Sequence, residues 1–403
     1  MRINGTEISR SHIVIGSLLI LGIILVVGLF FMFWGDADND GKNSDSFFGV
    51  LVNLIEEQPS SGDPLRGGMI IGENGAGEEE GVTLFRISED PVVGATLASD
   101  GKHVRYFKRA SGNLFETDFT GKNEIRVSNV TIPAILKVNW TSSKTYAIIS
   151  YYADGEIRRL YSQYSGTSTV SSAFLPNNIQ EITASRADDM IAYTVLTNGK
   201  TALFTARPNN TNIKNVYSPP APDFELSWPT ASIIALKQKS SAYAPGFLFT
   251  LNPSSKLLTR ILAKREGLDV LWSPHGSHML FMETTNEGTQ IHLGVATLKD
   301  TTVVTLPIIT LPEKCTWAPA SDSILYCAIP ETIPRGANLP DEWWQGSISF
   351  NDGLWHINVT TGERQQLLPT QQLDAINLFL SKDESFVFFT NKKDGTLWSL
   401  RLK

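Results

Sequence analysis

Three aspartates at alternate positions near the N-terminus are the first residues whose type and spacing could do chemistry. Asp36, Asp38 and Asp40 are followed by Gly41, which matches the first half of a calcium-binding loop. Alternate carboxylates in such a loop point at one cation, and the glycine permits a sharp turn. However, Phe47 stands at the twelfth position, where a bidentate glutamate belongs. A weak calcium site and an acidic, solvated spacer both remain open, and we expect no other cofactor.

Two further groups resemble fragments of known catalytic or metal-binding motifs. His275 and His278 are close enough to form a zinc pair, but no Cys, Asp or Glu accompanies them at ligand spacing. Zinc sites need three or four ligands, so a structural role is favoured. Gly346–Ser349 is a partial match to a nucleophile elbow, with Phe350 where the second glycine belongs. Because no complete motif is present, we predict that the chain is not an enzyme.

Two adjacent tryptophans in an acidic, proline-containing stretch are the best candidates for ligand binding. The candidate residues are Asp341, Glu342, Trp343 and Trp344. Paired tryptophans on a long connection are more common at binding sites than on idle surface. They suit a protein partner or the stacking of a sugar ring. In the alternative interpretation the stretch folds back and its aromatic residues anchor the connection itself.

A repeat organises the elements that must position these residues. In each repeat an apolar or small anchor is followed about nine residues later by an aromatic residue, in five of seven cases, and then by a glycine. Successive anchors are 43, 44, 44, 44, 45 and 63 residues apart: Leu97, Trp140, Ala184, Trp228, Trp272, Trp317 and Leu380. A period of about 40–45 residues built from short strands is typical of propeller blades. We predict an all-β, seven-bladed β-propeller over residues 82–403.

The ends of the repeat array predict how the ring closes. The seventh repeat stops at Lys403, after its third strand, and a spare strand at 82–87 precedes the first anchor. If the spare strand fills the empty place in the last blade, no long edge stays unpaired. We therefore predict that the segment around Leu84 pairs with the segment around Trp398.

The turns and third strands of the repeat resemble those of a known class of propellers. Ser99-Asp100-Gly101 is a first turn of the Ser-x-Asp-Gly type, and Gly353-Leu354-Trp355 begins a third strand. In these features residues 82–403 resemble TolB-like and WD40-like propeller repeats of bacteria, although the Gly-His and Trp-Asp signature of eukaryotic WD40 blades is absent. One membrane anchor followed by a degenerate propeller is similar to envelope proteins of small-genome bacteria. The resemblance implies the fold and an envelope location, and no mechanism.

The segment before the propeller predicts a membrane anchor. Residues 13–34 carry no charge over 22 positions, which is long enough for a helix to cross about 30 Å of hydrocarbon. Arg2 and Arg10 precede this stretch and acidic residues follow it. Because positive flanks stay in the cytoplasm, we predict a single-pass signal anchor in the cytoplasmic membrane, with residues 1–12 inside and the propeller outside. A cleaved signal peptide is the alternative.

The charge of the chain is concentrated in the segment that follows. Residues 35–81 hold eleven acidic and two basic side chains of a chain with a net charge of −7, so the propeller is nearly neutral. The Gly-rich and Glu-rich composition of 35–81 predicts a linker that does not order itself. A nearly neutral propeller lacks the basic surface that nucleic acid requires, so we expect no nucleic-acid partner.

The two cysteines, Cys315 and Cys327, both fall in the sixth repeat, on its first and second strands. A symmetric hairpin places them opposite each other, within reach of a disulfide, and an oxidising compartment favours that bond. Two buried free thiols are the alternative.

Taken together, these patterns predict a non-catalytic, membrane-anchored propeller that serves as a protein-interaction platform in the cell envelope. The alternative is a carbohydrate-binding module or a glycan-active envelope enzyme, which would make a glycan the ligand. Because a propeller fold does not fix a function, the two hypotheses must be separated by the geometry of the site.

Overall fold

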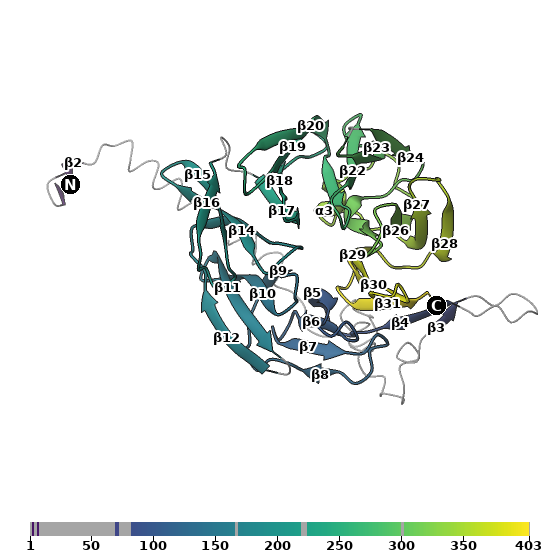
Figure 1. Ribbon diagram of the computed structural model, residues 1–403, viewed down its shortest axis with the longest axis horizontal. Helices are drawn as coiled ribbons and strands as arrows, with labels where there is room; N and C mark the ends of the chain where they lie inside the picture. The colour runs from purple at the N-terminus through teal and green to yellow at the C-terminus, as the bar shows by residue number, and fades with distance from the viewer. Residues whose placement is uncertain are drawn as a thin grey trace, which may run out of the picture. The chain divides into compact units, whose positions relative to one another are not determined.

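The computed structural model of the chain describes residues 2–3, 6–7, 69–71, 82–165, 168–218, 224–299 and 302–402 (Figure 1). The chain divides into two compact units, Met1–Ser61 and Gly62–Lys403. In the first unit the described residues are β1 (Arg2–Ile3) and β2 (Thr6–Glu7), which pair antiparallel. The predicted anchor at 13–34 and the three aspartates of the calcium hypothesis lie outside the described residues. Among those described, no helix has the length and apolar character to span a bilayer.

The second unit is a ring of seven antiparallel sheets, as the repeat predicts (Figure 1). Figure 1 shows β5, β9, β17 and β29 nearest the centre of the ring. In chain order the strands of the blades are β5 (Val92–Leu97), β6 (Val104–Lys108), β7 (Leu114–Thr117) and β8 (Ile125–Arg126); β9 (Ile135–Trp140), β10 (Tyr146–Ala153), β11 (Glu156–Ser165) and β12 (Ser168–Phe174); β13 (Ile179–Ala184), β14 (Ile191–Thr197), β15 (Lys200–Ala206) and β16 (Lys214–Tyr217); β17 (Phe224–Thr230), β18 (Ile233–Gln238), β19 (Pro245–Leu251) and β20 (Leu258–Glu266); β21 (Asp269–Trp272), β22 (His278–Thr285), β23 (Gln290–Thr297) and β24 (Val303–Leu306); β25 (Cys315–Trp317), β26 (Ile324–Pro330), β27 (Asp352–Asn358) and β28 (Arg364–Leu368); and β29 (Ala375–Leu380), β30 (Phe386–Asn391) and β31 (Leu397–Arg401), followed by β4 (Val82–Arg86).

The ring closes through the spare strand, and this prediction is confirmed. β31 pairs antiparallel with β4, with Leu400 opposite Leu84 and Trp398 opposite Arg86. A further strand, β3 (Met69–Ile71), pairs with β4 and makes the last blade five-stranded. The segment predicted as a linker over 35–81 therefore contains a strand. Its pairing covers the outer edge of β4, which would otherwise present unpaired backbone groups.

Most anchor and aromatic positions of the repeat lie in the core between blades. Among the described residues, the buried hydrophobic side chains form seven clusters, one at each junction of two neighbouring blades. The anchors Trp140 and Trp317 also donate indole N–H bonds to backbone carbonyls of the preceding blade, Gly94 at 2.7 Å and Leu271 at 3.1 Å. The repeat therefore records the positions at which one sheet packs on the next.

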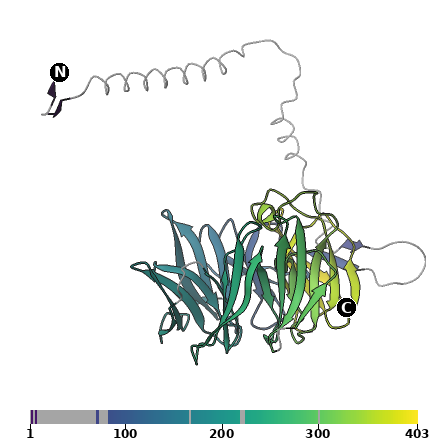
Figure 2. The same cartoon turned by 90° about the horizontal axis from the view of Figure 1, so that it is seen from above.

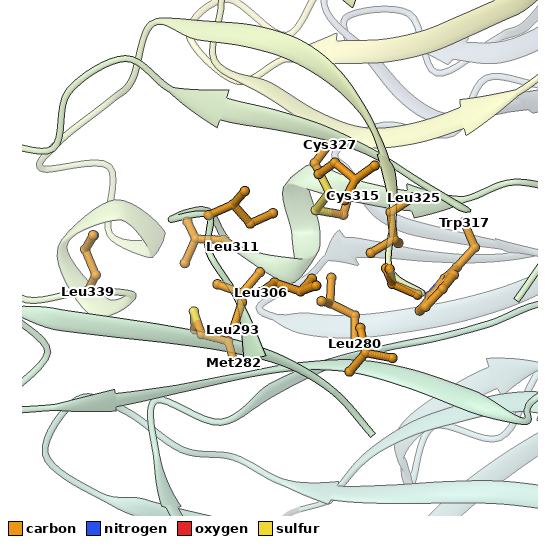
Figure 3. Close-up of a cluster of buried hydrophobic side chains, with 14 of the residues drawn as sticks. Leu280, Met282, Leu293, Leu306, Leu311, Cys315, Trp317, Leu325, Cys327 and Leu339 are labelled. Atoms are coloured by element: carbon orange, nitrogen blue, oxygen red, sulfur yellow. A yellow bond between two sulfur atoms is a disulfide. The ribbon is translucent and has the colours of Figure 1, made fainter. Parts of the chain in front are cut away.

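The sixth blade departs most from the repeat. Cys315 and Cys327 stand opposite each other on β25 and β26 and are joined by a disulfide, with their Cα atoms 4.1 Å apart. Figure 3 shows this bond at the edge of the cluster between the fifth and sixth blades. Leu339, from the long connection between β26 and β27, belongs to the same cluster. That connection carries the short helix α3 (Asp341–Trp344), and a single 3-10 turn, η1 (Pro312–Lys314), precedes β25.

The topology gives the propeller two distinct faces. We call the upper face the one that carries the connections between the second and third strands of a blade and between its fourth strand and the next blade. The lower face carries the remaining connections, between the first and second strands and between the third and fourth. Figure 2 shows the blade strands running between these two faces. The connection that carries α3 joins a second strand to a third, so it lies on the upper face.

Candidate functional site

The connection that carries α3 packs onto three other blades. Trp343 is 0% exposed and lies in the core between the fifth and sixth blades. Asp341 Oδ2 accepts a hydrogen bond from the backbone N–H of Ala242 in the fourth blade at 2.6 Å. The backbone N–H of Leu339 donates to the carbonyl of Gly288 in the fifth blade at 3.1 Å. The connection thus folds back on the propeller, as the alternative interpretation of its tryptophans expected.

The four residues predicted to bind a partner therefore differ in how far a ligand can reach them. Trp343 has no surface with which to contact a partner, because its side chain is fully buried. Glu342 is half-buried and its Oε2 accepts the backbone N–H of Asn338 at 3.2 Å. Trp344 remains 36% exposed. Trp344 is thus the aromatic residue of this group that a ligand can reach.

Buried charges hold Trp343 in place. Asp374 Oδ2 accepts the indole N–H of Trp343 at 3.0 Å, and Asp374 Oδ1 lies 2.5 Å from Lys314 Nζ. The same ammonium group, itself 0% exposed, lies 2.7 Å from Asp352 Oδ2. Burial raises the pKa of Asp352 to about 6 against the opposing charge of Lys314. Removing one partner of such a group leaves a buried charge uncompensated, which is strongly unfavourable. Trp343 is hydrogen-bonded to Asp374 of this group, and the group therefore holds α3 in position.

A second charge group lies at the upper ends of the fourth and fifth blades. Lys237 on β18 is 2.8 Å from Glu225 Oε2 on β17 and 2.7 Å from Asp269 Oδ1 on β21. Burial alone would lower the pKa of Lys237, but the charges of Asp269 and Glu225 outweigh it and raise that pKa. In the repeat, Lys237 stands where the other blades carry an aromatic residue or isoleucine. The sequence shows this exception to the repeat, and Lys237 is not among the site residues predicted from it.

Glu313, in η1 of the sixth blade, adds a third carboxyl group to Glu225 and Asp269. The indole N–H of Trp344 donates to Glu313 Oε1 at 2.9 Å. The surrounding protein desolvates the carboxyl group although part of its surface stays exposed, and Asp269 adds a like charge; these two effects raise the pKa of Glu313 to about 7. A carboxyl group that titrates near neutrality is suited to accept or donate a proton. Glu225, Asp269 and Glu313 are called the acidic group below.

A cavity of about 460 Å³ opens on the same face, at the inner ends of the seventh, first and second blades. Its walls carry three cationic side chains, Arg109, Lys137 and Lys392, and no carboxylate. Asn377 adds an exposed amide. The volume falls within the range of about 300–1,000 Å³ typical of small-ligand sites. We call this cavity the cationic pocket.

The three cations of the pocket differ in how far the protein neutralises them. Lys137 lies 3.0 Å from Glu181 Oε1. Lys392 Nζ donates to the carbonyl of Trp343 at 2.6 Å and lies 4.6 Å from the centre of its ring. For Arg109 and Lys392, no ion pair is found within the part of the chain that the structure describes. The pocket therefore has positive charge available for an anionic ligand.

Helix α3 connects the cationic pocket with the acidic group. Lys392 binds the backbone of Trp343, and Glu313 binds the side chain of the next residue, Trp344. Lys392 of the cationic pocket and Glu313 of the acidic group therefore contact neighbouring residues of α3, and the exposed Trp344 lies on the side of Glu313. We call Arg109, Lys137, Lys392, Glu313 and Trp344 the upper site. Its residues come from separate repeats, which is why no linear motif marks it.

The histidines do not form a metal site. His275 Nδ1 lies 3.2 Å from Asp322 Oδ1, and Ser277 Oγ lies 2.8 Å from Nδ1 of His278, the first residue of β22. Over the described ranges, no three His, Cys, Asp or Glu side chains are placed to hold a metal ion. Both histidines therefore have polar partners within the protein.

Comparison with solved structures gives the same fold. An oligogalacturonate lyase from Vibrio parahaemolyticus is similar at a TM-score of 0.56 and 10% identity, over 83% of this chain and 98% of that chain. An oligogalacturonate lyase in complex with manganese is similar at a TM-score of 0.55 and 10% identity, over 80% and 94%. The β-propeller domain of Cps50 (Swd1) from Myceliophteria thermophila is similar at 0.50 and 8%, over 83% and 100%. No protein-family model and no curated protein matches the chain.

These likenesses confirm the propeller fold that the repeat implies, and they correct two predictions. The chain was expected to be a non-catalytic protein-interaction platform and not an enzyme, and both expectations are contradicted because the two lyases are enzymes built on this propeller. The absence of a catalytic motif within one segment does not argue against an enzyme, because a propeller site gathers residues from several blades. At 10% identity the likeness establishes the fold alone. Any reaction must be inferred from the geometry of the upper site.

Proposed function

We propose that the chain is a glycan-active enzyme that binds an acidic oligosaccharide at the upper site. The cationic pocket is the observation that carries this proposal, because it combines a volume of about 460 Å³ with three cations and no carboxylate in its walls. Carboxylates form their strongest hydrogen bonds with charged donors, and Arg109 can bind one with two parallel N–H groups. A saccharide chain bearing carboxylates, such as a uronate oligomer, fits this lining.

Trp344 supplies the second element of saccharide binding. Its partly exposed indole lies beside the acidic group, with its N–H engaged by Glu313. Aromatic faces bind the apolar faces of sugar rings, while the polar tip keeps a hydrogen bond. A chain held by Lys392 and Arg109 through its carboxylates can therefore place a neighbouring ring on Trp344.

Glu313 supplies the proton transfer. In a uronate, the hydrogen on the ring carbon that bears the carboxylate becomes more acidic when cations bind the carboxylate. The ionised Glu313 takes this proton, and the electron pair of the broken C–H bond forms a double bond to the neighbouring carbon. The bond from that carbon to the glycosidic oxygen breaks, and the departing oxygen takes a proton from solvent. A base with a pKa near 7 suits this elimination at neutral pH.

The named activity of the two lyases supports an acidic saccharide substrate, and their 10% identity keeps the reaction a proposal. One of them is described with manganese. In the described part of this chain no cluster of three ligating side chains exists, so these residues do not fit such an ion.

We further propose that residues 13–34 hold this enzyme at the outer side of the cytoplasmic membrane. The support is the uncharged stretch of 22 residues with positive charge before it and acidic residues after it. Protease added to intact spheroplasts should cleave the propeller from the cells. A fully protected propeller would show that the orientation is wrong.

The enzymatic proposal is tested by incubating the propeller with uronate oligosaccharides and following unsaturated products by ultraviolet absorbance and mass spectrometry. We expect products from the wild-type protein and a loss of about 10²–10⁴-fold for Glu313→Gln. Binding with no product would remove the proposed catalytic step and leave a binding protein. Absence of both binding and product would contradict the function itself.

A further inference from the structure

We infer that the lower face carries a second saccharide site, which takes a neutral sugar with adjacent hydroxyl groups. A cavity of about 490 Å³ lies between the second and third blades, and its lining includes two tyrosines, two carboxylates and one arginine. Its volume also falls within the range of about 300–1,000 Å³ of small-ligand sites. It is assembled from residues that the upper site does not use. We call it the lower pocket.

The register of the second blade places one wall of the lower pocket on a single face of its sheet. Tyr146 on β10 stands opposite Gln163 on β11, and Gln163 stands opposite Ser171 on β12. Residues directly opposite in an antiparallel sheet point to the same side. Tyr161 lies two residues before Gln163 and so shares this side, and its hydroxyl group lies 3.2 Å from Ser171 Oγ. This wall therefore offers two aromatic rings with hydroxyl and amide groups between them.

Turns of the third blade form the opposite wall. Asp188 and Asp189 lie in the turn between β13 and β14, and Arg207 follows β15. Asp189 Oδ1 accepts the backbone N–H of Ser143 at 3.0 Å, which ties the turn to the second blade. This bond leaves Asp189 Oδ2 and the carboxylate of Asp188, which is exposed, available to a ligand.

The chemistry of the two walls selects a neutral saccharide. A sugar ring can pack on Tyr146 while its hydroxyl groups donate to the carboxylate of Asp188 and accept from Arg207. Each carboxylate can accept two donors at once, which favours a pair of adjacent hydroxyl groups. Two carboxylates against one arginine disfavour a uronate, because like charges repel at short range.

The two pockets therefore differ in the sign of charge that they offer to a ligand. The lower pocket is lined by first-to-second and third-to-fourth connections, and the cationic pocket by the connections of the other face. The inference does not depend on the proposed function, since the lower pocket is argued from its own residues. Its failure would leave acidic oligosaccharide binding at the upper site untouched.

The test is a calorimetric titration of the full chain with neutral cello-, xylo-, manno- and malto-oligosaccharides. We expect one of these series to bind with one site per chain. We expect Tyr146→Ala and Asp188→Asn each to weaken that binding by about tenfold or more. Asp188→Asn is included because its exposed position in a turn makes misfolding a poor explanation of any loss. The matched control is Glu363→Gln, which removes an exposed carboxylate from the lower face of the sixth blade and should leave binding unchanged.

Three results would overturn the inference. The first is that none of the four series binds at millimolar concentration. The second is that binding occurs but survives both Tyr146→Ala and Asp188→Asn with unchanged affinity. The third is that an acidic uronate oligosaccharide displaces the bound neutral sugar, because a site that takes both ligands is not a separate site selective for neutral sugars.

Discussion

Trp344 donates its indole N–H to Glu313 across 2.9 Å, and this bond joins the one exposed tryptophan of α3 to a carboxyl group whose pKa is raised to about 7. The neighbouring residue, Trp343, is buried and hydrogen-bonded to Asp374. Two adjacent residues of the same type thus have separate tasks. Trp343 fixes the helix to the propeller, and Trp344 presents a ring and a hydrogen bond at the upper site.

Replacing each tryptophan should separate these two tasks. Trp343→Ala is expected to lower the free energy of unfolding by about 3–5 kcal/mol, because it leaves a cavity in the core. Trp344→Ala should change stability by far less, because its side chain is partly exposed, and should weaken binding of a uronate oligosaccharide. Urea unfolding and calorimetric titration measure the two effects. Equal losses of stability in both variants would contradict this division.

Glu313→Gln should change how the stability of the protein depends on pH. The pKa of Glu313 is raised from 4.5 to about 7 on folding, so the folded state binds this proton more tightly than the unfolded state. The resulting stabilisation is complete below pH 4.5 and is lost as the pH rises through about 7. Glutamine stays neutral, so the melting temperature of the variant relative to the wild type should be higher at about pH 8 than at about pH 5.

A constant difference in melting temperature across this range would show that Glu313 titrates at its ordinary value. The matched control is Glu363→Gln, an exposed glutamate of the sixth blade. The pH dependence of activity should depend on the same carboxyl group. The wild-type rate should rise as Glu313 loses its proton near pH 7.

Loss of the disulfide should destabilise the protein. Cys315 and Cys327 are 12 residues apart. Closing a loop of this size lowers the conformational entropy of the unfolded chain, which stabilises the folded state by about 3 kcal/mol. The double variant Cys315→Ala and Cys327→Ala should lower the free energy of unfolding by about 2–4 kcal/mol. Alkylation of the denatured wild-type protein with and without reductant, followed by mass spectrometry, checks the bond directly. Full alkylation without reductant would contradict it.

The closing strand should be required for the integrity of the ring. Leu84 on β4 is 1% exposed and packs between the sixth and seventh blades. Leu84→Ala should lower the free energy of unfolding by about 2–5 kcal/mol through the cavity that it leaves. Thr83, which precedes it on the same strand, is half-buried, and Thr83→Ala should cost less. Similar stabilities for Leu84→Ala and the wild type would show that β4 does not close the ring.

The fold could be predicted from the sequence because its core repeats. Six of the seven anchors lie where one blade packs on the next, and in the fifth blade Trp272 and Phe281 belong to one such cluster. The pairing of the segments around Leu84 and Trp398 could be predicted for a similar reason, since the array lacked one strand at one end and held a spare strand at the other.

The upper site could be predicted only in part. The departure of the sixth repeat identified Trp344, but nothing in a linear sequence brings Lys392, Arg109 and Lys137 to one cavity, because they belong to three different blades. Glu313 likewise acquires its raised pKa from the desolvating surroundings and from Asp269 of the neighbouring blade. One signal of the charged residues on this face is present in the sequence. Lys237 is charged at a position where every other blade is apolar or aromatic.

The measurement that tests the central claim most directly is a titration of the propeller with a uronate oligosaccharide and with its methyl ester, which lacks the negative charges. The account predicts binding of the acid form, weakened by added salt, and a loss of about tenfold or more both for the ester and for Arg109→Gln. Arg260→Gln, an exposed arginine on the outer strand β20, should bind as the wild type does. Equal affinity for the acid and the ester, unaffected by Arg109→Gln, would contradict the account.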